Sequence, residues 1–313
     1  MKNYLPLNIL IFQIIFFHFL LQTSGAQENL LSEVSNQQDA SWTELVFKGS
    51  KLMTNITVKI QLSSADQLSG SQSPNIGTGL DDCSKAVTGD KVLTVQSSSK
   101  GVGSSGQYEE EVWFDGKALH PGKRIRLSGG NDPWVKSYCW EDNGVRRLKI
   151  FPGKSSEKKH PPSKWTKRSE SFYEYPVDSA GCATILDPSV VFYMLTTLDL
   201  SSQKEAMEIC VFGRKQLHRV TIRQEKNSSL KVAYKERSAS GEGRVKDKIT
   251  PVVFSISTKA LPATKQKPEA YSFLGLNKDI RIFMDPEKRL PVKIIGTNNS
   301  IGELVLDLKV QSK

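Results

Sequence analysis

Hydrophobic and polar residues alternate with a period of two along much of this chain, the pattern of a β-strand with one buried face. The clearest case is Lys51 to Leu62, where Ile56, Val58 and Ile60 share a face. The alternation recurs at residues 230–235 and 303–310. Shorter strands are predicted at residues 93–98, 108–114, 123–127, 145–151, 170–175, 207–212, 217–224, 251–258 and 279–284.

One segment has helical spacing instead. Asp187 is a good N-cap residue, and Pro188 suits the first turn of a helix. An apolar stripe follows at Val191, Met194, Leu195 and Leu198. We therefore predict an all-β, mainly antiparallel fold: a strongly curved sheet or half-barrel, with one short helix near residues 187–199 that packs this stripe against the sheet.

The N-terminal 26 residues have the pattern of a secretory signal. Lys2 precedes a mostly apolar run, and small residues at positions 24–26 suit cleavage. An uncleaved membrane anchor is the alternative, but the run is shorter than a membrane span needs. We expect a signal peptide at residues 1–26, a flexible segment at 27–41 and one curved β-sheet domain at 42–313. No later stretch is apolar and long enough to cross a membrane.

Four cysteines follow the predicted signal: Cys83, Cys139, Cys182 and Cys210. An even number of cysteines in an exported protein favours disulfides, and four cysteines allow three connectivities. Proximity in the sequence favours Cys83 with Cys139 and Cys182 with Cys210. Four unpaired buried thiols are the alternative.

Residues 63–106 are rich in Ser and Gly and predict long loops. Gly101, Gly103 and Gly106 match the G-x-G-x-x-G spacing of dinucleotide-binding proteins. That site needs a helix directly after it, because the pyrophosphate binds at the helix N-terminus. Residues 108–114 alternate like a strand instead, so we interpret the glycines as a hairpin loop.

Other catalytic signatures are missing from the sequence, including the G-x-S-x-G, H-E-x-x-H and P-loop patterns. The histidines after the signal, His120, His160 and His218, are widely separated. We therefore expect no enzyme activity, no cofactor and no metal. A hydrolase with scattered active-site residues stays open, because such sites leave no local motif.

A basic stretch spans residues 144–168, and we expect it to be a basic loop region. It holds nine of the 43 Lys and Arg residues and one acidic residue, Glu157, so it accounts for most of the formal net charge of +10. Such a segment suits anionic lipid, lipopolysaccharide or acidic polysaccharide, while nucleic acid does not suit an exported protein. A solvated loop is the alternative. The candidate ligand-binding residues are Arg146, Arg147, Lys149, Lys154, Lys158, Lys159, Lys164, Lys167 and Arg168.

Two segments resemble a bacterial family of exported proteins known as domain-of-unknown-function family 3108. Residues 187–200, DPSVVFYMLTTLDL, are similar to a helix of that family, and residues 283–292, FMDPEKRLPV, to its terminal hairpin. Val190, Thr196 and Ile282 depart from the family pattern. The resemblance implies a periplasmic protein with a curved antiparallel sheet, and structural roles for Asp187, Pro188, Tyr193, Leu195, Asp285, Arg289 and Pro291.

These observations favour a secreted or periplasmic cell-envelope protein without enzymatic activity. Its curved sheet would bind an amphiphilic or anionic glycan or lipid ligand, with the basic segment at the anionic part and the apolar sheet face at the hydrocarbon. The alternative is a protein-protein assembly or scaffolding factor for outer-membrane or surface-polymer machinery. In that case an envelope protein would be the partner, and the protein's own side chains would fill the sheet.

Overall fold

The computed structural model describes residues 39–51, 53–68, 83, 89–101, 104–198, 206–225, 228–261 and 270–313. These residues form 17 strands of one sheet, with few helices. The strands are β1 (Glu44–Lys51), β2 (Thr54–Ser64), β3 (Lys91–Gly101), β4 (Ser104–Phe114), β5 (Pro121–Ser128), β6 (Trp134–Glu141), β7 (Gly144–Phe151), β8 (Lys167–Glu174), β9 (Ile185–Leu186), β10 (Ala206–Phe212), β11 (Leu217–Glu225), β12 (Leu230–Ser238), β13 (Gly241–Ile249), β14 (Val252–Leu261), β15 (Lys278–Asp285), β16 (Leu290–Asn298) and β17 (Gly302–Ser312). The helices are α2 (Ala65–Leu68) and α3 (Pro188–Thr197), with 3-10 segments η1 (Ser155–Lys159), η2 (Pro162–Lys164) and η3 (Val177–Gly181).

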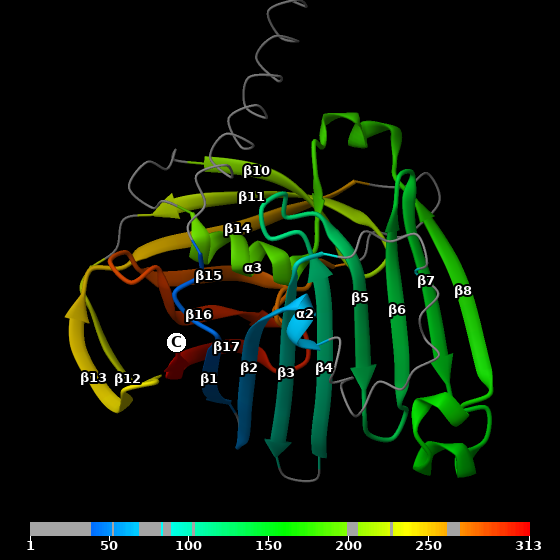
Figure 1. Cartoon of the computed structure of the whole chain (residues 1–313), viewed down its shortest axis with the longest axis horizontal. Helices are drawn as coiled ribbons and strands as arrows, with labels where there is room; N and C mark the ends of the chain where they lie inside the picture. The colour runs from blue at the N-terminus through cyan, green and yellow to red at the C-terminus, as the bar shows by residue number, and fades with distance from the viewer. Residues whose placement is uncertain are drawn as a thin grey trace, which may run out of the picture.

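The sheet is mainly antiparallel, and near its middle the first strand, β1, pairs with the last strand, β17. From β8 the strands pair in descending order to β1, and β1 pairs with the last strand, β17. From β17 the order continues through β16, β15, β14 and β11 to β10, which pairs in parallel with β9. The β12–β13 hairpin joins β17 through a short parallel pairing. The sheet is open, and Figure 1 shows its strong curvature.

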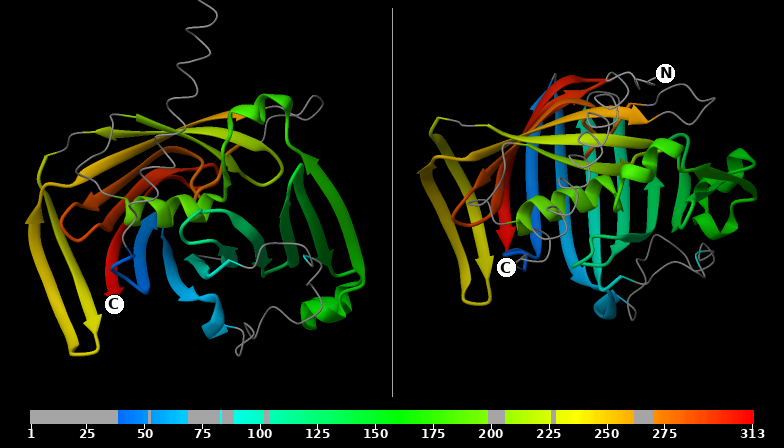
Figure 2. Two further views of the ribbon diagram at one scale, coloured as in Figure 1. Left: turned by 45° about the horizontal axis from the view of Figure 1, so that its top comes forward. Right: turned by 90° about the horizontal axis from the view of Figure 1, so that it is seen from above.

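Helix α3 lies inside the curve of the sheet (Figure 2). Residues from both arms of the sheet, β1 to β8 and β9 to β17, contact the helix. The ring of Phe192 meets those of Trp42 and Phe47, at centroid distances of 6.0 and 6.4 Å, and that of Phe273 before β15 at 6.3 Å. Tyr193 meets Phe114 of β4 at 5.0 Å. All ten residues of α3 are buried, whereas the sequence predicted burial of one stripe only. The helix lies deep in the concave side of the sheet, and even its Ser and Thr side chains are buried.

The alternation of the sequence predicted most of the sheet. Every predicted strand overlaps an observed strand, and Ile56, Val58 and Ile60, which alternation places on one face, are all buried. The cap of α3 is also confirmed, because the Asp187 side chain accepts a hydrogen bond from the backbone N–H of Ser189 at 2.8 Å. Both predicted disulfides, Cys83–Cys139 and Cys182–Cys210, are present.

Four predicted boundaries differ from the structure. Within residues 51–62 a turn interrupts the strand, since Met53 has a φ of 62° and β2 begins at Thr54. Residues 91–101 and 104–106, predicted as loop, belong to β3 and β4, which pair as a hairpin around the glycines. Residues 69–82, 84–88 and 102–103 of that predicted loop region lie outside the described residues. Residues 144–168 contain β7, η1, η2 and the start of β8, so they are not one loop.

The fourth correction concerns the segment predicted to be flexible, residues 27–41. Its last residues are packed: Ala40 contacts the core, and the Ser41 hydroxyl donates to the backbone oxygen of Lys288 at 2.9 Å. Residues 1–38, which include the predicted signal peptide, lie outside the described residues.

The residues of the second family-like segment form the turn between β15 and β16. Asp285 accepts hydrogen bonds from the backbone N–H groups of Glu287 and Lys288, at 3.0 and 3.2 Å. Arg289 has a φ of 49°, and Pro291 begins the inward run of β16. Such carboxylate-capped turns stabilise a hairpin locally, so these residues have a structural role.

Candidate functional site

The inner face of β4 to β8 carries rows of polar side chains that the strand register sets side by side. Glu110 is opposite Arg126, Arg126 is opposite Lys136, and Lys136 is opposite Lys149. Directly opposed residues have their Cβ atoms about 4.5–5.5 Å apart. We call Arg126, Lys136 and Lys149, with Arg147 of the adjacent row, the cationic row.

The adjacent row is anchored by a buried ion pair with the cap of α3. Arg124 Nη1 lies 2.6 Å from Asp187 Oδ2, with side-chain exposures of 2% and 0%. Arg124 also donates to the backbone oxygen of Gly213 at 2.8 Å, and its guanidinium carbon lies 4.2 Å from the ring centroid of Tyr138. Burial raises the pKa of Asp187 to about 6, although Arg124 opposes this rise. The pair joins β5, α3 and the loop after β10.

Glu110 is the centre of a second buried network. Its Oε1 accepts a hydrogen bond from the hydroxyl of Ser189 at 2.6 Å, and its Oε2 accepts one from Tyr108 at 2.5 Å. Arg126 Nε lies 3.1 Å from the same Oε2 and also donates to the Tyr108 hydroxyl. Burial raises the pKa of Glu110, but Arg126 and Arg124 outweigh burial and lower it overall. A charged carboxylate therefore balances Arg126.

The rest of the cationic row has no such balance. In the part of the chain that the structure describes, no ion pair involves Lys136, Arg147 or Lys149, or Arg214 after β10. Two of them contact aromatic rings: Lys136 Nζ lies 3.9 Å from the ring centroid of Trp134, and Lys149 Nζ lies 4.4 Å from that of Phe151. Arg147 Nη2 donates a hydrogen bond to the Ser171 hydroxyl at 2.9 Å. Like charges directly opposite in a sheet are destabilising. An anion from outside the chain would remove that repulsion.

Of these cations, Lys136 is the one whose charged form is most strongly disfavoured by its surroundings. Burial, the largest cause, acts with the charges of Arg126, Arg147, Lys149 and Arg214 and lowers the pKa of Lys136 to about 7. These groups approach it from β5, β7 and the loop after β10. Near neutral pH the row is therefore poised to take up a proton when an anion approaches.

Replacing Lys136 by Met should stabilise the unliganded protein in a pH-dependent way. An unfolded lysine has a pKa near 10.5, so between pH 7 and 10.5 the unfolded state binds more protons and native stability rises with pH. Urea denaturation should show the gain of Lys136→Met over the wild type to be largest below about pH 7 and to shrink towards about pH 10. Lys231→Met, at an exposed position on β12, is the control. An equal gain at all pH values would contradict the shifted pKa.

A cavity of about 250 Å³ adjoins Arg126. It lies between the inner face of β2 to β5, the start of α3 and the turns at residues 213–214 and 272–275. A larger hollow, of about 610 Å³, is bounded mostly by outward-facing residues of β2 to β5 and by Trp165. Its basic residue, Lys59, is already paired with Glu44 at 2.7 Å, and its other charged residue, Glu109, is acidic. In the inner cavity Arg214 has no ion pair among the described residues, and Arg126 connects the cavity to the cationic row, so the inner cavity is the better candidate site.

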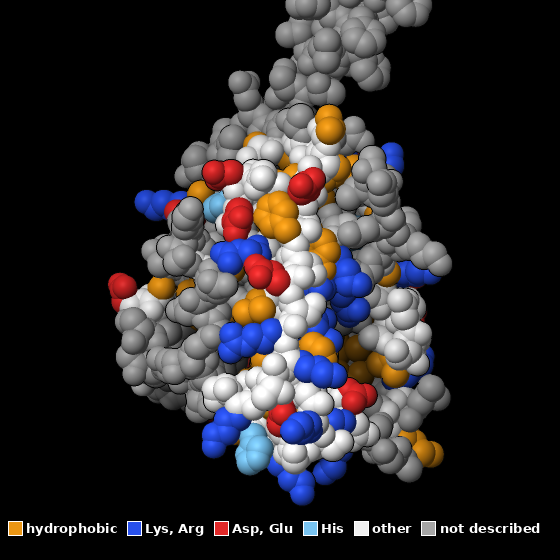
Figure 3. Space-filling model, turned by 90° about the vertical axis from the view of Figure 1, so that its right-hand side faces the viewer, with side chains coloured by type: hydrophobic (Ala, Val, Ile, Leu, Met, Phe, Trp, Pro, Cys, Tyr) orange, Lys and Arg blue, Asp and Glu red, His pale blue; other side chains and the backbone are white. Residues whose placement is uncertain are grey.

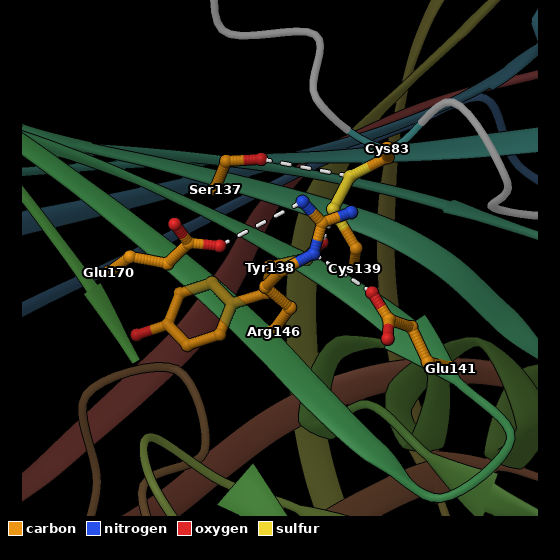
Figure 4. Close-up of a disulfide and its surroundings, with 7 residues drawn as sticks. All are labelled: Cys83, Ser137, Tyr138, Cys139, Glu141, Arg146 and Glu170. Carbon is orange, nitrogen blue, oxygen red and sulfur yellow. Dashed lines mark hydrogen bonds and ion pairs between the residues drawn. A yellow bond between two sulfur atoms is a disulfide. The ribbon is translucent and has the colours of Figure 1, made fainter. Parts of the chain in front are cut away.

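The structure divides the nine basic residues that the sequence grouped together. Arg147, Lys149 and Lys167 share the inner face of β7 and β8, while Arg146 and Arg168 occupy the opposite face. Figure 4 shows Arg146 between Glu141 and Glu170, close to the Cys83–Cys139 disulfide. The others, Lys154, Lys158, Lys159 and Lys164, belong to η1, η2 and their flanks.

This outer group does not make a concentrated site. Lys158 is paired with Asp132 at 3.2 Å. Glu157 accepts hydrogen bonds from Gly153 and Thr166, at 2.8 and 3.0 Å. From the side of β8, Figure 3 shows Lys and Arg spread among acidic and hydrophobic side chains. These residues therefore match the solvated-surface alternative better than the inner three do.

The sequence analysis missed Arg124, Arg126, Lys136 and Arg214. A signal for the first two was present, because Arg124 and Arg126 alternate with Ile125 and Leu127 in a predicted strand. Alternation indicates that the hydrophobic residues share a buried face, but it does not say which face of the curved sheet that is. Here Ile125 packs with Val135, Ile150 and Trp165 in a separate cluster on the outer face, which leaves the arginines inside.

The described residues show no metal centre and no membrane-spanning helix. His, Cys, Asp and Glu side chains nowhere gather there in a group of three or more that could hold a metal ion. No helix in the described ranges is long and apolar enough to cross a membrane. His218 is buried with its ring 5.5 Å from that of Tyr271, a packing contact.

Comparison with known proteins adds no assignment. No family model, no curated protein and no solved structure matches the chain. The function therefore has to be argued from the chemistry of the cationic row and the adjoining cavity.

Proposed function

We propose that the protein is exported and binds an anionic glycan or lipid ligand on the inner face of its curved sheet, without catalysing a reaction on it. The observation that supports this proposal is the cationic row, in which Lys136, Arg147 and Lys149 have no acidic partner among the described residues. Two disulfides are consistent with a compartment outside the reducing cytoplasm.

The test compares two triple variants in which the same number of basic residues is replaced. Lys136→Gln, Arg147→Gln and Lys149→Gln together should weaken binding by at least about 100-fold, because hydrogen bonds to charged groups contribute about 1.5–3 kcal/mol each. The matched control replaces the outer residues Lys158, Lys159 and Lys164 by Gln, and should change binding by less than about threefold. The probes are a heparin tetrasaccharide and phosphatidylglycerol vesicles, measured by calorimetry.

Equal losses in the two triple variants would mean that the attraction is only a general effect of net charge. Absence of wild-type binding to both probes, and to the small acidic saccharides and phosphates tested below, would overturn the proposal. Circular dichroism of each variant checks that the sheet is intact.

A role in protein assembly is the second candidate, and the β12–β13 hairpin favours it. Among the described strands β13 pairs only with β12, and most of its residues are exposed. An unpaired strand edge can accept a strand from another protein. Crosslinking in the native host would then recover a stable partner protein, and Val245→Pro in β13 would abolish the crosslink. Co-purification of a small anion with no protein partner would contradict this alternative.

A further inference from the structure

In the part of the chain that the structure describes, α3 fills the apolar part of the inner face. The sequence analysis assigned that surface to the ligand's hydrocarbon, but α3 occupies it with ten buried residues. The core around α3 is continuous and contains residues of both arms, including Phe47, Phe254 and Leu306. Protein interiors are packed at crystal-like density, so acyl chains would have to displace the helix.

The cavity that the described residues form beside α3 is small, and its walls are both polar and apolar. The cavity of about 250 Å³ is below the usual range of about 300–1,000 Å³ for sites that hold drug-sized ligands. Its lining supplies hydroxyl groups from Ser97, Tyr108 and Ser189, the Glu110 carboxylate and the Arg126 guanidinium. Donors and acceptors are therefore both present, together with the apolar side chains of Val58 and Val95.

This combination suits a sugar ring better than an alkyl chain. Each sugar hydroxyl is both a donor and an acceptor, and buried hydroxyl groups need partners of both kinds. An alkyl chain in the same cavity would leave Ser97, Arg126 and Arg214 facing a group that cannot form hydrogen bonds. Arg126 belongs both to the cavity lining and to the cationic row, so one ligand could occupy both.

We propose that the ligand is an acidic saccharide, with one sugar ring in this cavity and its phosphate, sulfate or carboxylate group on Lys136, Arg147 and Lys149. This inference rests on the proposed function and specifies the chemical class of its ligand. In this arrangement the cavity binds the sugar ring and the cationic row binds the anionic group.

Isothermal titration calorimetry of the whole mature protein tests the inference with four probes. Glucose 6-phosphate and glucuronate represent acidic saccharides, inorganic phosphate represents the anion alone, and decyl phosphate represents an anion with an alkyl chain. We expect at least one acidic saccharide to bind at least tenfold more tightly than inorganic phosphate. Decyl phosphate should bind no more tightly than inorganic phosphate.

A variant with a filled cavity distinguishes the contribution of the sugar ring to binding from the contribution of the charged group. Ser97→Phe fills the cavity next to Val95 and should remove the preference for the acidic saccharide while leaving phosphate binding within about threefold of the wild type. The triple Gln variant of the cationic row should lose all four probes. Should Ser97→Phe fail to fold, the ranking of the probes with the wild-type protein still decides.

Two results would overturn the inference. Tenfold tighter binding of decyl phosphate than of inorganic phosphate would mean a lipid ligand, and equal binding of the saccharides and phosphate would mean that the ring makes no contact. In both cases the anion-binding function would stand. Failure of the heparin tetrasaccharide and the vesicles, as well as of all four probes, would remove the proposed function itself.

Discussion

Replacing Asp187 by Asn is expected to destabilise the protein by about 3–5 kcal/mol, the usual cost of removing one partner from a buried ion pair. Arg124 would remain 2% exposed without its carboxylate. Asn is as good an N-cap as Asp, so the loss would report the buried charge rather than the cap of α3. Urea denaturation at neutral pH measures the effect.

Asp285→Asn is the matched control for this substitution. Asp285 is also buried and also caps backbone N–H groups, but its turn contains no buried ion pair. Its replacement should cost about 1 kcal/mol or less. The double variant with Arg124→Met and Asp187→Asn should be more stable than Asp187→Asn alone, because no unpaired charge remains. A loss below about 1 kcal/mol for Asp187→Asn would contradict this account.

Removing the Cys182–Cys210 disulfide by Ser substitution at both positions is the second large effect. Its cysteines are 28 residues apart. Closing a loop of that length lowers the entropy of the unfolded chain, which raises the free energy of the unfolded state by about 3.6 kcal/mol at 25 °C. The bond also joins the segment before α3 to β10, next to the pairing of Cys210 with Ile185. Denaturation should therefore occur at clearly lower urea concentration.

The other disulfide provides the comparison. Cys83 and Cys139 are 56 residues apart, which predicts a somewhat larger loss, about 4.2 kcal/mol. Excess reducing agent should bring the wild type to the stability of a variant that lacks both bonds and should leave that variant unchanged. Equal stability of the wild type with and without reductant would show that the bridges do not constrain the unfolded chain.

Most strands with clear hydrophobic alternation were predicted, but β6, β13, β16 and all of β1 except Lys51 were missed. β13 was missed because nearly all of its residues are polar and exposed. β6 was missed because four consecutive residues, Ser137 to Trp140, are buried on both faces of the sheet, which hides the period of two. The resemblance to domain-of-unknown-function family 3108 stays a prediction.

The candidate site was predicted only in part, for a geometric reason. Arg146 and Arg147 are neighbours in the sequence, but successive side chains of a strand point to opposite faces. Arg126, Lys136 and Lys149 are ten or more residues apart in the sequence, yet register sets them side by side. A basic stretch therefore identified two of the four residues of the cationic row and named several that lie elsewhere.

The sequence by itself determined what depends on near neighbours: the strands with clear alternation, the helix that Asp187 caps, and a pairing of cysteines by proximity. Tertiary structure alone decided that α3 fills the curve of the sheet, that Arg124 reaches Asp187, and that three cations meet on three adjacent strands. The physical reason is that alternation and capping are properties of a few consecutive residues. Register and the choice of the inner face depend instead on contacts between segments far apart in the chain.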